Sequence, residues 1–338
     1  MKSQIDSADA ALAGGGMSPA DTVECERRLQ KRPGDIEARA RLVGRLSMER
    51  MFSAQSSAAY LEHVRWFVEN RPRDELLRSG FVIFAPGMDD KGAPIIERLW
   101  RRHLKRWPDD LEILDAVAMF YRFRRSNRGL PLLRRAMRLD PLNVRWPKEI
   151  AHLYRLDALV GRRGTKSAAS NALNYFSRAL AMTQSHRDRF YLLSDLAEMA
   201  EIAGQSEAAT EYAQQLLLDA ERYPTDWNFG NAIYRGNEVL GLVALRKRKV
   251  ELAEKHLLAA SRSNGSPQLG SFGPSFRLAK ALAKQGHWSQ LGRFLQNVAK
   301  FWTMGQGALV KWRADVAKRR VPDFNAAFKY RSDLGKGR

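Results

Sequence analysis

The residues of this chain that could perform acid–base, nucleophilic or metal chemistry are six histidines and one cysteine. The histidines are His63, His103, His152, His186, His256 and His287. None lies three or four positions from another histidine, so the helical spacing that puts two imidazoles on one zinc ion is absent. Cys25 has no neighbouring base in the sequence and no second cysteine to pair with. We therefore expect no metal site, no cofactor and no enzymatic activity.

Two short segments come close to known ligand-binding loops but lack their required residues. A phosphate-binding loop needs a glycine, four residues and then Gly-Lys-Ser/Thr after a strand, and Thr165 stands where the second glycine belongs. Asp89-Asp90-Lys91 is too short for a calcium loop, whose acidic ligands spread over about twelve residues. Both segments are interpreted as turns.

Basic residues outnumber acidic ones, and the excess is confined to two segments. The 338 residues include 57 Lys and Arg against 37 Asp and Glu, a formal charge of +20. Residues 1–97 are nearly balanced, with 14 basic and 15 acidic residues, and residues 167–245 are acidic, with 5 and 10. Residues 98–166 hold 18 basic and 7 acidic residues, and residues 246–338 hold 20 and 5. This segregation favours an anionic partner.

The first basic segment places its charges on one side of a predicted helix. Arg98, Arg102 and Arg106 lie four positions apart, with Arg101 and Lys105 adjacent, on the side of the helix away from Leu99 and Leu104. Guanidinium groups bind carboxylate or phosphate through paired hydrogen bonds, which a lysine cannot do. The candidate partner-binding residues, called the basic ridge from here on, are Arg98, Arg101, Arg102, Lys105, Arg122, Arg124 and Arg125.

Helices must position these residues, because apolar residues recur at steps of three and four along most of the chain. No convincing alternating strand is present, and the run Phe81–Phe84 is interpreted as buried helix. The first twenty residues contain no apolar stretch long enough for export or membrane spanning. We expect an all-α cytoplasmic protein.

Proline-containing turns recur at regular intervals. Pro33, Pro72, Pro108 and Pro141 are spaced 39, 36 and 33 residues apart, and each is followed by an acidic or amide residue that can cap the next helix. A period in the thirties with one such turn after each helix is typical of stacked helix hairpins.

The residues around these turns resemble the tetratricopeptide repeat (TPR) family. The family places Leu and Gly on its first helix, small residues and an aromatic on its second, and Pro at the end. The segments that carry the resemblance are Val239–Ala244 with Ala253, Leu257 and Ala260; Leu196, Ala197 and Ala200 with Gly204, Ala209 and Ala213; Leu278, Ala279, Gly286, Trp288, Leu291 and Leu295; Ala136–Pro141; and Tyr175–Leu180. The match covers residues 21–302.

The resemblance implies an α-solenoid of stacked antiparallel helix hairpins, wound as a right-handed superhelix of seven or eight hairpins. The domain prediction is a flexible leader over residues 1–20, a solenoid over 21–320 with a possible sub-division near 161–167, and a C-terminal tail over 321–338. The segments 161–167 and 263–274 are predicted to be long loops, either insertions or recognition elements. The second of these is similar to a segment of bacterial helical-repeat proteins.

The TPR resemblance implies no catalytic residue. A carboxylate clamp known in that family needs Lys and Asn on the first helix, and the matching positions here hold Glu238, Val239 and Leu242. Four nearby residues are candidates for lining a groove, although burial at the start of a helix explains them equally well. These groove candidates are Asn231, Tyr234, Arg235 and Asn237.

Three interpretations of the basic ridge remain open. We expect a non-catalytic scaffold that binds an acidic protein segment. The alternative is RNA or DNA binding through the same arginines, ranked second because no base-reading helix or RNA motif is present. The third interpretation is that the arginines form ion pairs with the acidic residues of 167–245 and only keep the protein in solution. The oligomeric state is left open.

Overall fold

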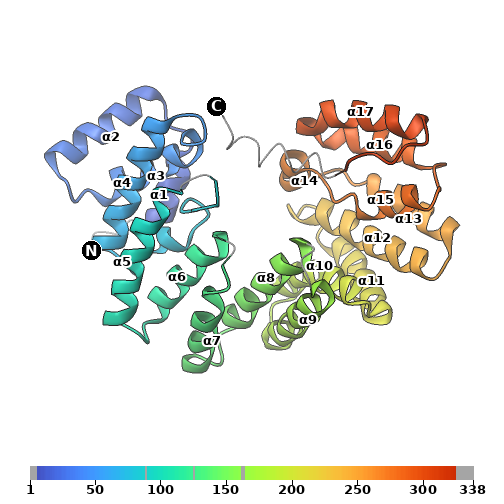
Figure 1. Cartoon of the computed structure of the whole chain (residues 1–338), viewed down its shortest axis with the longest axis horizontal. Coiled ribbons are helices and arrows are strands. Elements are labelled where there is room, and N and C mark those ends of the chain that lie inside the picture. Colours follow the sequence, from blue (N-terminus) through green and yellow to red (C-terminus); the bar gives the residue numbers. More distant parts are fainter. Residues whose placement is uncertain (1–5, 88–89, 125, 161–163, 325–338) are drawn as a thin grey trace. The chain divides into compact units, whose positions relative to one another are not determined.

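The computed structural model describes residues 6–87, 90–124, 126–160 and 164–324, and over these residues the protein is built of helices and turns without a strand (Figure 1). The predicted all-α class is confirmed for this part of the chain. The chain divides into two compact units: the N-terminal unit ends at Trp146 and the C-terminal unit begins at Pro147. The sequence suggested a sub-division near 161–167, of which residues 161–163 lie outside the described residues. The division falls earlier because Arg145 and Trp146 bind Asp115 and Asp140 of the N-terminal unit.

In the N-terminal unit, α1 and α4 both pack against α3, and α7 packs against α6. Aromatic and branched side chains from several of these helices fill its core, including Tyr60, Phe67, Ile96 and Ile113. The elements are α1 (Ser7–Gly14), α2 (Pro19–Lys31), α3 (Ile36–Glu49), α4 (Ala54–Asn70), the short 3-10 helix η1 (Glu75–Arg78), α5 (Ala93–Arg106), α6 (Leu111–Phe123), α7 (Gly129–Leu139) and the start of α8 (Arg145–Val160).

Helix α1 corrects the prediction of a flexible leader over residues 1–20. Asp6 caps this helix, and Ala10 and Ala11 are buried against α3. The two helices approach so closely that a methyl group on Gly44 would overlap the carbonyl oxygen of Ala11. Alanine and glycine, which resembled a linker composition, are here the small residues that allow two helix backbones to touch.

The proline-containing turns lie where the sequence predicts them, each followed by a capping side chain. Asp35 accepts a hydrogen bond from the backbone N–H of Ala38 at 3.0 Å, and Asp110 accepts one from Ile113 at 3.0 Å. Asp74 begins η1 by accepting from the N–H of Leu76. These caps satisfy N–H groups that would otherwise lack a partner in the first turn of a helix.

The run Phe81–Phe84, predicted to be buried helix, is irregular backbone. The hydroxyl of Tyr60 donates to the carbonyl of Phe81 at 3.0 Å and accepts from the N–H of Ile83 at 3.2 Å. A side chain from α4 therefore satisfies backbone groups that a helix would pair internally. Only the burial of Phe84 matches the prediction.

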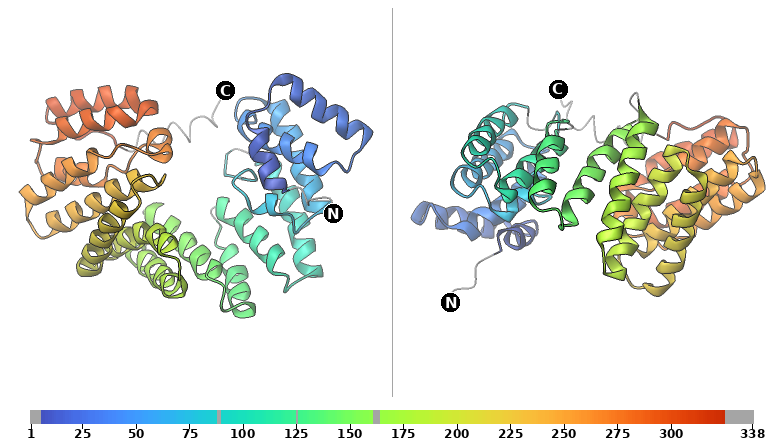
Figure 2. Two further views of the ribbon diagram at one scale, coloured as in Figure 1. Left: turned by 180° about the vertical axis from the view of Figure 1, so that it is seen from behind. Right: turned by 90° about the horizontal axis from the view of Figure 1, so that it is seen from below.

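In the C-terminal unit, consecutive helices from α9 to α13 each pack against the next (Figure 2). The elements are the rest of α8, then α9 (Thr165–Met182), α10 (His186–Ala203), α11 (Ser206–Arg222), α12 (Phe229–Arg246), α13 (Val250–Ser261), α14 (Pro267–Phe272), α15 (Arg277–Lys284), α16 (Leu291–Phe301), the 3-10 helix η2 (Thr303–Gly305) and α17 (Gln306–Ala317). Ala197, Gly241 and Ala253 are buried, as expected of small residues between helices.

Two segments predicted to be loop or tail are more ordered than expected. The segment 263–274 contains the short helix α14, which begins at a cap formed by Ser266. The start of the predicted tail packs onto the unit, since Phe324 is buried and its ring stacks on Phe276 at 5.3 Å. Residues 325–338 lie outside the described residues. Apolar burial of one aromatic ring is the physical reason that Val321–Phe324 stay on the core.

A methyl group at Gly44 is expected to separate α1 from α3. Gly44→Ala should lower the free energy of unfolding of the N-terminal unit by about 1–3 kcal/mol, the usual cost of overpacking a tight contact. Urea unfolding followed by circular dichroism measures this loss. Gly34→Ala is the matched control, because no atom lies within 4 Å of the added methyl group. Equal stability of the two variants would contradict the close approach.

Candidate functional site

The α5 part of the basic ridge lies on the solvent side of its helix. Ile96, Leu99 and Trp100 are buried on the opposite side. The four ridge residues of this helix are all exposed: Arg98, Arg101, Arg102 and Lys105. The arrangement follows directly from helical periodicity, which separates an apolar and a charged face on one helix.

One carboxylate of α5 lies at the edge of this ridge and binds one of its cations together with an arginine from outside it. Glu97 accepts from Arg101 at 2.6 Å and from Arg128 of the turn before α7, and the hydroxyl of Tyr121 donates to it at 3.1 Å. Partial burial raises the pKa of Glu97, but the hydrogen bonds from Arg101 and Tyr121 and the two positive charges outweigh burial and hold this pKa below its ordinary value. Glu97 is therefore ionised at neutral pH and ties Arg128 to α5. Arg128 was not among the predicted ridge residues.

Three cations of the ridge have no such partner. Among the described residues, no carboxylate forms an ion pair with Arg98, Arg102 or Lys105. Their Cα atoms span about 10 Å of helix at 1.5 Å per residue. This row of exposed, unpaired charges is the part of the ridge that is able to bind an external anion.

An aromatic platform continues the ridge at the C-terminal end of α5. The guanidinium carbons of Arg73 and Arg106 lie 4.8 and 4.6 Å from the ring centroid of Trp107, and the ring of His103 stacks on the same indole at 5.5 Å. Such cation–π contacts hold guanidinium planes in place. The sequence shows Arg106 beside Trp107, but only the fold brings Arg73 to the same ring.

The remaining predicted ridge residues, Arg122, Arg124 and Arg125, lie outside α5. Arg124 forms an ion pair with Asp90 at 3.1 Å. Arg122 is half-buried and contacts the sulfur of Met119 at 3.8 Å. Arg125 lies outside the described residues. The structure thus supports one continuous row on α5 rather than a ridge that extends equally over α6.

The groove candidates on α12 are bound to neighbouring elements of the C-terminal unit. Tyr234 and Asn237 are buried: the Tyr234 hydroxyl donates to the carbonyl of Ser275, and the Asn237 amide contacts His256 at 3.0 Å. Asn231 donates to Gln268 of α14 at 3.0 Å. Tyr234 and Asn237 are therefore not surface residues, which corrects the prediction for these two. Burial at the helix–helix interface, which the sequence allowed as an alternative, is what the fold adopts.

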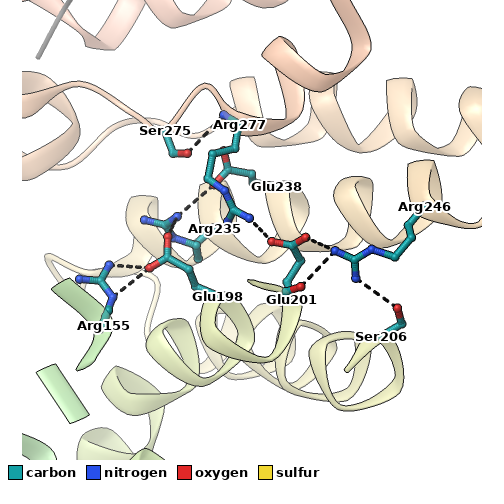
Figure 3. A network of polar contacts seen from close by, with 9 residues as sticks. All are labelled: Arg155, Glu198, Glu201, Ser206, Arg235, Glu238, Arg246, Ser275 and Arg277. Atoms are coloured by element: carbon teal, nitrogen blue, oxygen red, sulfur yellow. Dashed lines mark hydrogen bonds and ion pairs between the residues drawn. The ribbon is translucent and has the colours of Figure 1, made fainter. Parts of the chain in front are cut away.

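Arg235, the fourth groove candidate, belongs to a buried ion network that the sequence did not reveal (Figure 3). It binds Glu198 of α10 and lies 3.0 Å from Glu238 of its own helix. Arg155 of α8 binds Glu198 from the other side at 2.6 Å. Burial raises the pKa of Glu198, but the charges of Arg155, Arg235 and Arg277 outweigh it and bring the pKa to about 2. This carboxylate stays charged well into the acidic range.

A second carboxylate of α10 extends the network to α15 and the end of α12. Glu201 is buried and binds Arg277 as well as Arg246, the latter at 2.6 Å. Arg246 also donates to Ser206 at 3.3 Å. Glu198 and Glu201, two acidic residues of the middle segment, are thus neutralised inside the C-terminal unit by its own arginines. The sequence contains a partial sign of this network, because two acidic residues spaced three apart on a largely apolar helix are unusual.

His63 and Cys25 make packing contacts with neighbouring side chains. His63 accepts a hydrogen bond from Arg39 at 3.1 Å, and because a guanidinium only donates, the imidazole proton resides on the other nitrogen. Arg39 also lies 4.4 Å from the Trp66 ring. Cys25 contacts the sulfur of Met17 at 3.9 Å, and burial raises the pKa of its thiol. This arrangement does not activate either group for catalysis.

Two adjoining hollows of the N-terminal unit are lined by ion pairs. Their volumes are about 490 and 550 Å³, and they share Glu75, Arg78 and Glu112. Arg78 lies 3.4 Å from Glu112, and Arg145 lies 2.6 Å from Asp115 in the first hollow. Neither lining contains a histidine, cysteine or lysine. Across the described part of the chain, no three His, Cys, Asp or Glu side chains are grouped so that they could hold a metal ion.

Compared with models of known protein families and with curated proteins, the chain matches none of them. The TPR resemblance therefore rests on the residues quoted above and on the packing of consecutive helices. Over residues that the structure describes, no helix is both long and apolar enough to cross a membrane.

Removal of one buried carboxylate should unfold the C-terminal unit more easily. Glu198→Gln leaves the half-buried Arg155 and Arg235 with only Asp195 and Glu238 as counter-charges, and we expect a loss of about 1–3 kcal/mol in the free energy of unfolding. Urea unfolding monitored by circular dichroism measures it. Glu211→Gln, at an exposed position on the next helix, is the control and should change stability by less than 0.5 kcal/mol or so. A loss below about 1 kcal/mol for Glu198→Gln would show that the network does not hold these helices.

Acid should weaken the N-terminal unit through His63. Burial and the nearby Arg39 lower the pKa of His63 to about 4 from an ordinary 6.5. Because the unfolded chain binds the proton more readily, the contribution of this histidine is complete above pH 6.5 and is lost as the pH falls toward 4, by at most about 1.4 kcal/mol per pH unit. Unfolding curves at pH 7, 6, 5 and 4.5 test this. His63→Asn keeps an acceptor for Arg39 and should flatten the pH dependence; an unchanged dependence would assign it to other groups.

Proposed function

We propose that this chain is a non-catalytic, TPR-like repeat scaffold of the cytoplasm, in which helix hairpins stack as an α-solenoid and the α5 face binds an acidic protein segment. The observation that carries the proposal is the row Arg98, Arg102 and Lys105, which is exposed and has no ion-pair partner among the described residues. Consecutive helix packing supports the scaffold, and the unpaired row supports the binding face.

The contrast with the C-terminal unit strengthens this proposal. There, Arg155, Arg235 and Arg277 each meet a buried carboxylate. The acidic residues that could have neutralised the ridge include Glu198 and Glu201, and both are already occupied by arginines of their own unit. Internal neutralisation by these acids therefore does not account for the α5 row.

The geometry of the row favours a short acidic segment. Charges at positions 98, 102 and 105 repeat at helical spacing over about 10 Å, which matches carboxylates on one face of a partner helix or in a short extended peptide. Partially exposed charge pairs contribute little individually, so several are needed and the interaction should weaken with salt. Lys105 and the two arginines supply this multiplicity, and the platform at Trp107 adds aromatic surface beside it.

Charge reversal of the row is the direct test. The triple variant Arg98→Glu, Arg102→Glu and Lys105→Glu should bind a fluorescent 12-residue glutamate-rich peptide at least tenfold more weakly than the native chain, because attraction becomes repulsion. Fluorescence anisotropy at 50 and 150 mM NaCl measures the affinity. The control reverses three exposed cations of the same unit, Lys31, Arg32 and Lys91, and should change affinity less than twofold.

Two results would overturn the proposal. One is equal loss of peptide binding in both triple variants, which would show that only total charge matters. The other is that a single-stranded RNA or a DNA duplex binds the α5 row more tightly than the peptide, which would establish the nucleic-acid alternative.

A further inference from the structure

The C-terminal unit contains two arginines in a backbone conformation that normally selects glycine. Arg248 has φ of 59° and Arg319 has φ of 51°, and these are the non-glycine residues with positive φ in the described part of the chain. A side chain in this left-handed region clashes with its own backbone, which is why glycine is strongly preferred there.

Both arginines occupy the same position in the same helix-ending motif. In each case the following residue donates its N–H to a carbonyl five positions earlier: Lys249 to Ala244 at 2.9 Å, and Arg320 to Asp315 at 2.9 Å. Two further helices of this unit end identically, with bonds from Gln205 to Ala200 and from His287 to Leu282. These four helix ends can therefore be compared directly.

Glycine occupies the left-handed position of the other two helix ends. Gly204 has φ of 87° and Gly286 has φ of 80°. The motif thus forms with glycine in this protein, and arginine is retained at two of four equivalent positions despite the strain. Strain that persists without a packing benefit indicates a role for the side chain itself.

The strained arginines lie in runs of exposed cations. Lys247 and Lys249 flank Arg248, and Lys318 precedes Arg319. Lys284 is the last residue of α15, next to the turn that contains Gly286. In the part of the chain that the structure describes, none of these six side chains has an ion-pair partner, whereas Arg320 pairs with Asp315 at 3.2 Å.

Contacts between helices place these helix ends at one edge of the unit. Arg246 reaches Ser206, so the α12–α13 turn lies beside the α10–α11 turn. Ser289 donates to Glu254 at 2.7 Å, which puts the start of α16 beside the start of α13. The short connection at η2 makes α17 antiparallel to α16, and rings on both helices, Phe294 and Trp312, contact Phe276. The end of α17 therefore lies near the start of α16.

We propose that this edge, defined by residues 246–249, 284–287 and 318–320 and called the turn edge, binds the phosphate backbone of a nucleic acid. The cations stand on turns of three neighbouring helix pairs. A phosphodiester chain requires only repeated charge contacts and tolerates flexible lysines and arginines. The turn edge holds eight Lys and Arg, and the carboxylates near it in sequence are the exposed Glu251 and Asp323 and Asp315, which pairs with Arg320, so its net charge is positive. This site is separate from the α5 row.

The helix dipole offers a competing explanation, because cations near a helix C-terminus are favourable. Lys247 and Lys318 already provide charge at these ends from positions with negative φ. The two explanations differ in sign: if the dipole accounts for Arg248 and Arg319, replacement by glycine destabilises, and if binding accounts for them, replacement relieves strain.

The test combines stability and binding in the full-length chain. Arg248→Gly and Arg319→Gly should each raise the Tm of the C-terminal unit by about 2–4 °C. Binding of a fluorescent 20-base-pair DNA duplex, measured by anisotropy between 25 and 200 mM NaCl, should weaken in both. The slope of log affinity against log salt should become shallower by about 0.9 for each arginine removed.

Matched variants separate the turn edge from general charge. Gly286→Arg places a cation at the third equivalent position, and we expect a lower Tm together with a slope steeper by about 0.9. Lys166→Gln removes an exposed charge from α9 and should leave the slope unchanged. The triple glutamate variant of the α5 row should likewise bind the duplex with the native slope.

Any of three outcomes would overturn this inference. Unchanged duplex binding in the Arg248→Gly/Arg319→Gly double variant would remove the site. A lower Tm in the single glycine variants would assign the arginines to helix capping. Tighter binding of a glutamate-rich peptide than of the duplex, lost in the double variant, would make the turn edge a second protein-binding surface.

Discussion

The C-terminal unit depends on two carboxylates, Glu198 and Glu201, that α10 carries into its interior. A buried charge costs several kcal/mol unless it is matched, and the matching arginines come from α8, α12 and α15. Each of these helices must therefore take a place where its guanidinium group reaches α10. Ion pairs of this kind add little net stability compared with apolar packing, but they penalise every arrangement of helices that leaves a carboxylate unmatched.

The pairing of charges also distinguishes arginines that stabilise the fold from arginines that are available to bind a partner. Inside the C-terminal unit, arginines and carboxylates neutralise one another, and in the N-terminal unit Arg39 is held by Trp66 and His63. Arginines with structural duties are thus recognisable by their partners. In the part of the chain that the structure describes, exposed cations without an ion-pair partner include Arg98, Arg102 and Lys105 on α5 and Arg248 and Arg319 on the turns of the last helix pairs. Both proposals rest on this separation between arginines that hold the fold together and arginines that the fold leaves available.

The predictions that held depend on local physics. Helical periodicity separated the exposed Arg98 from the buried Leu99, and proline turns with capping aspartates marked the helix starts at Asp35 and Asp110. The predictions that failed depend on a partner distant in sequence. Phe81–Phe84 is irregular because a tyrosine from another helix binds its backbone, and α1 is ordered because its alanines face Gly44. Composition alone described that segment as a flexible leader.

By itself, then, the amino-acid sequence determined the all-α class, the places of the turns, the charged face of α5 and the concentration of positive charge in two segments, because each follows from spacing along one chain. Tertiary structure alone decided which arginines form ion pairs with buried carboxylates. It brought Arg235 to Glu198 across 37 positions and Arg277 to Glu201 across 76, and it placed Arg248 at a position that glycine holds in an equivalent turn. The physical reason is that pairing and strain are properties of three-dimensional neighbours, which no periodicity encodes.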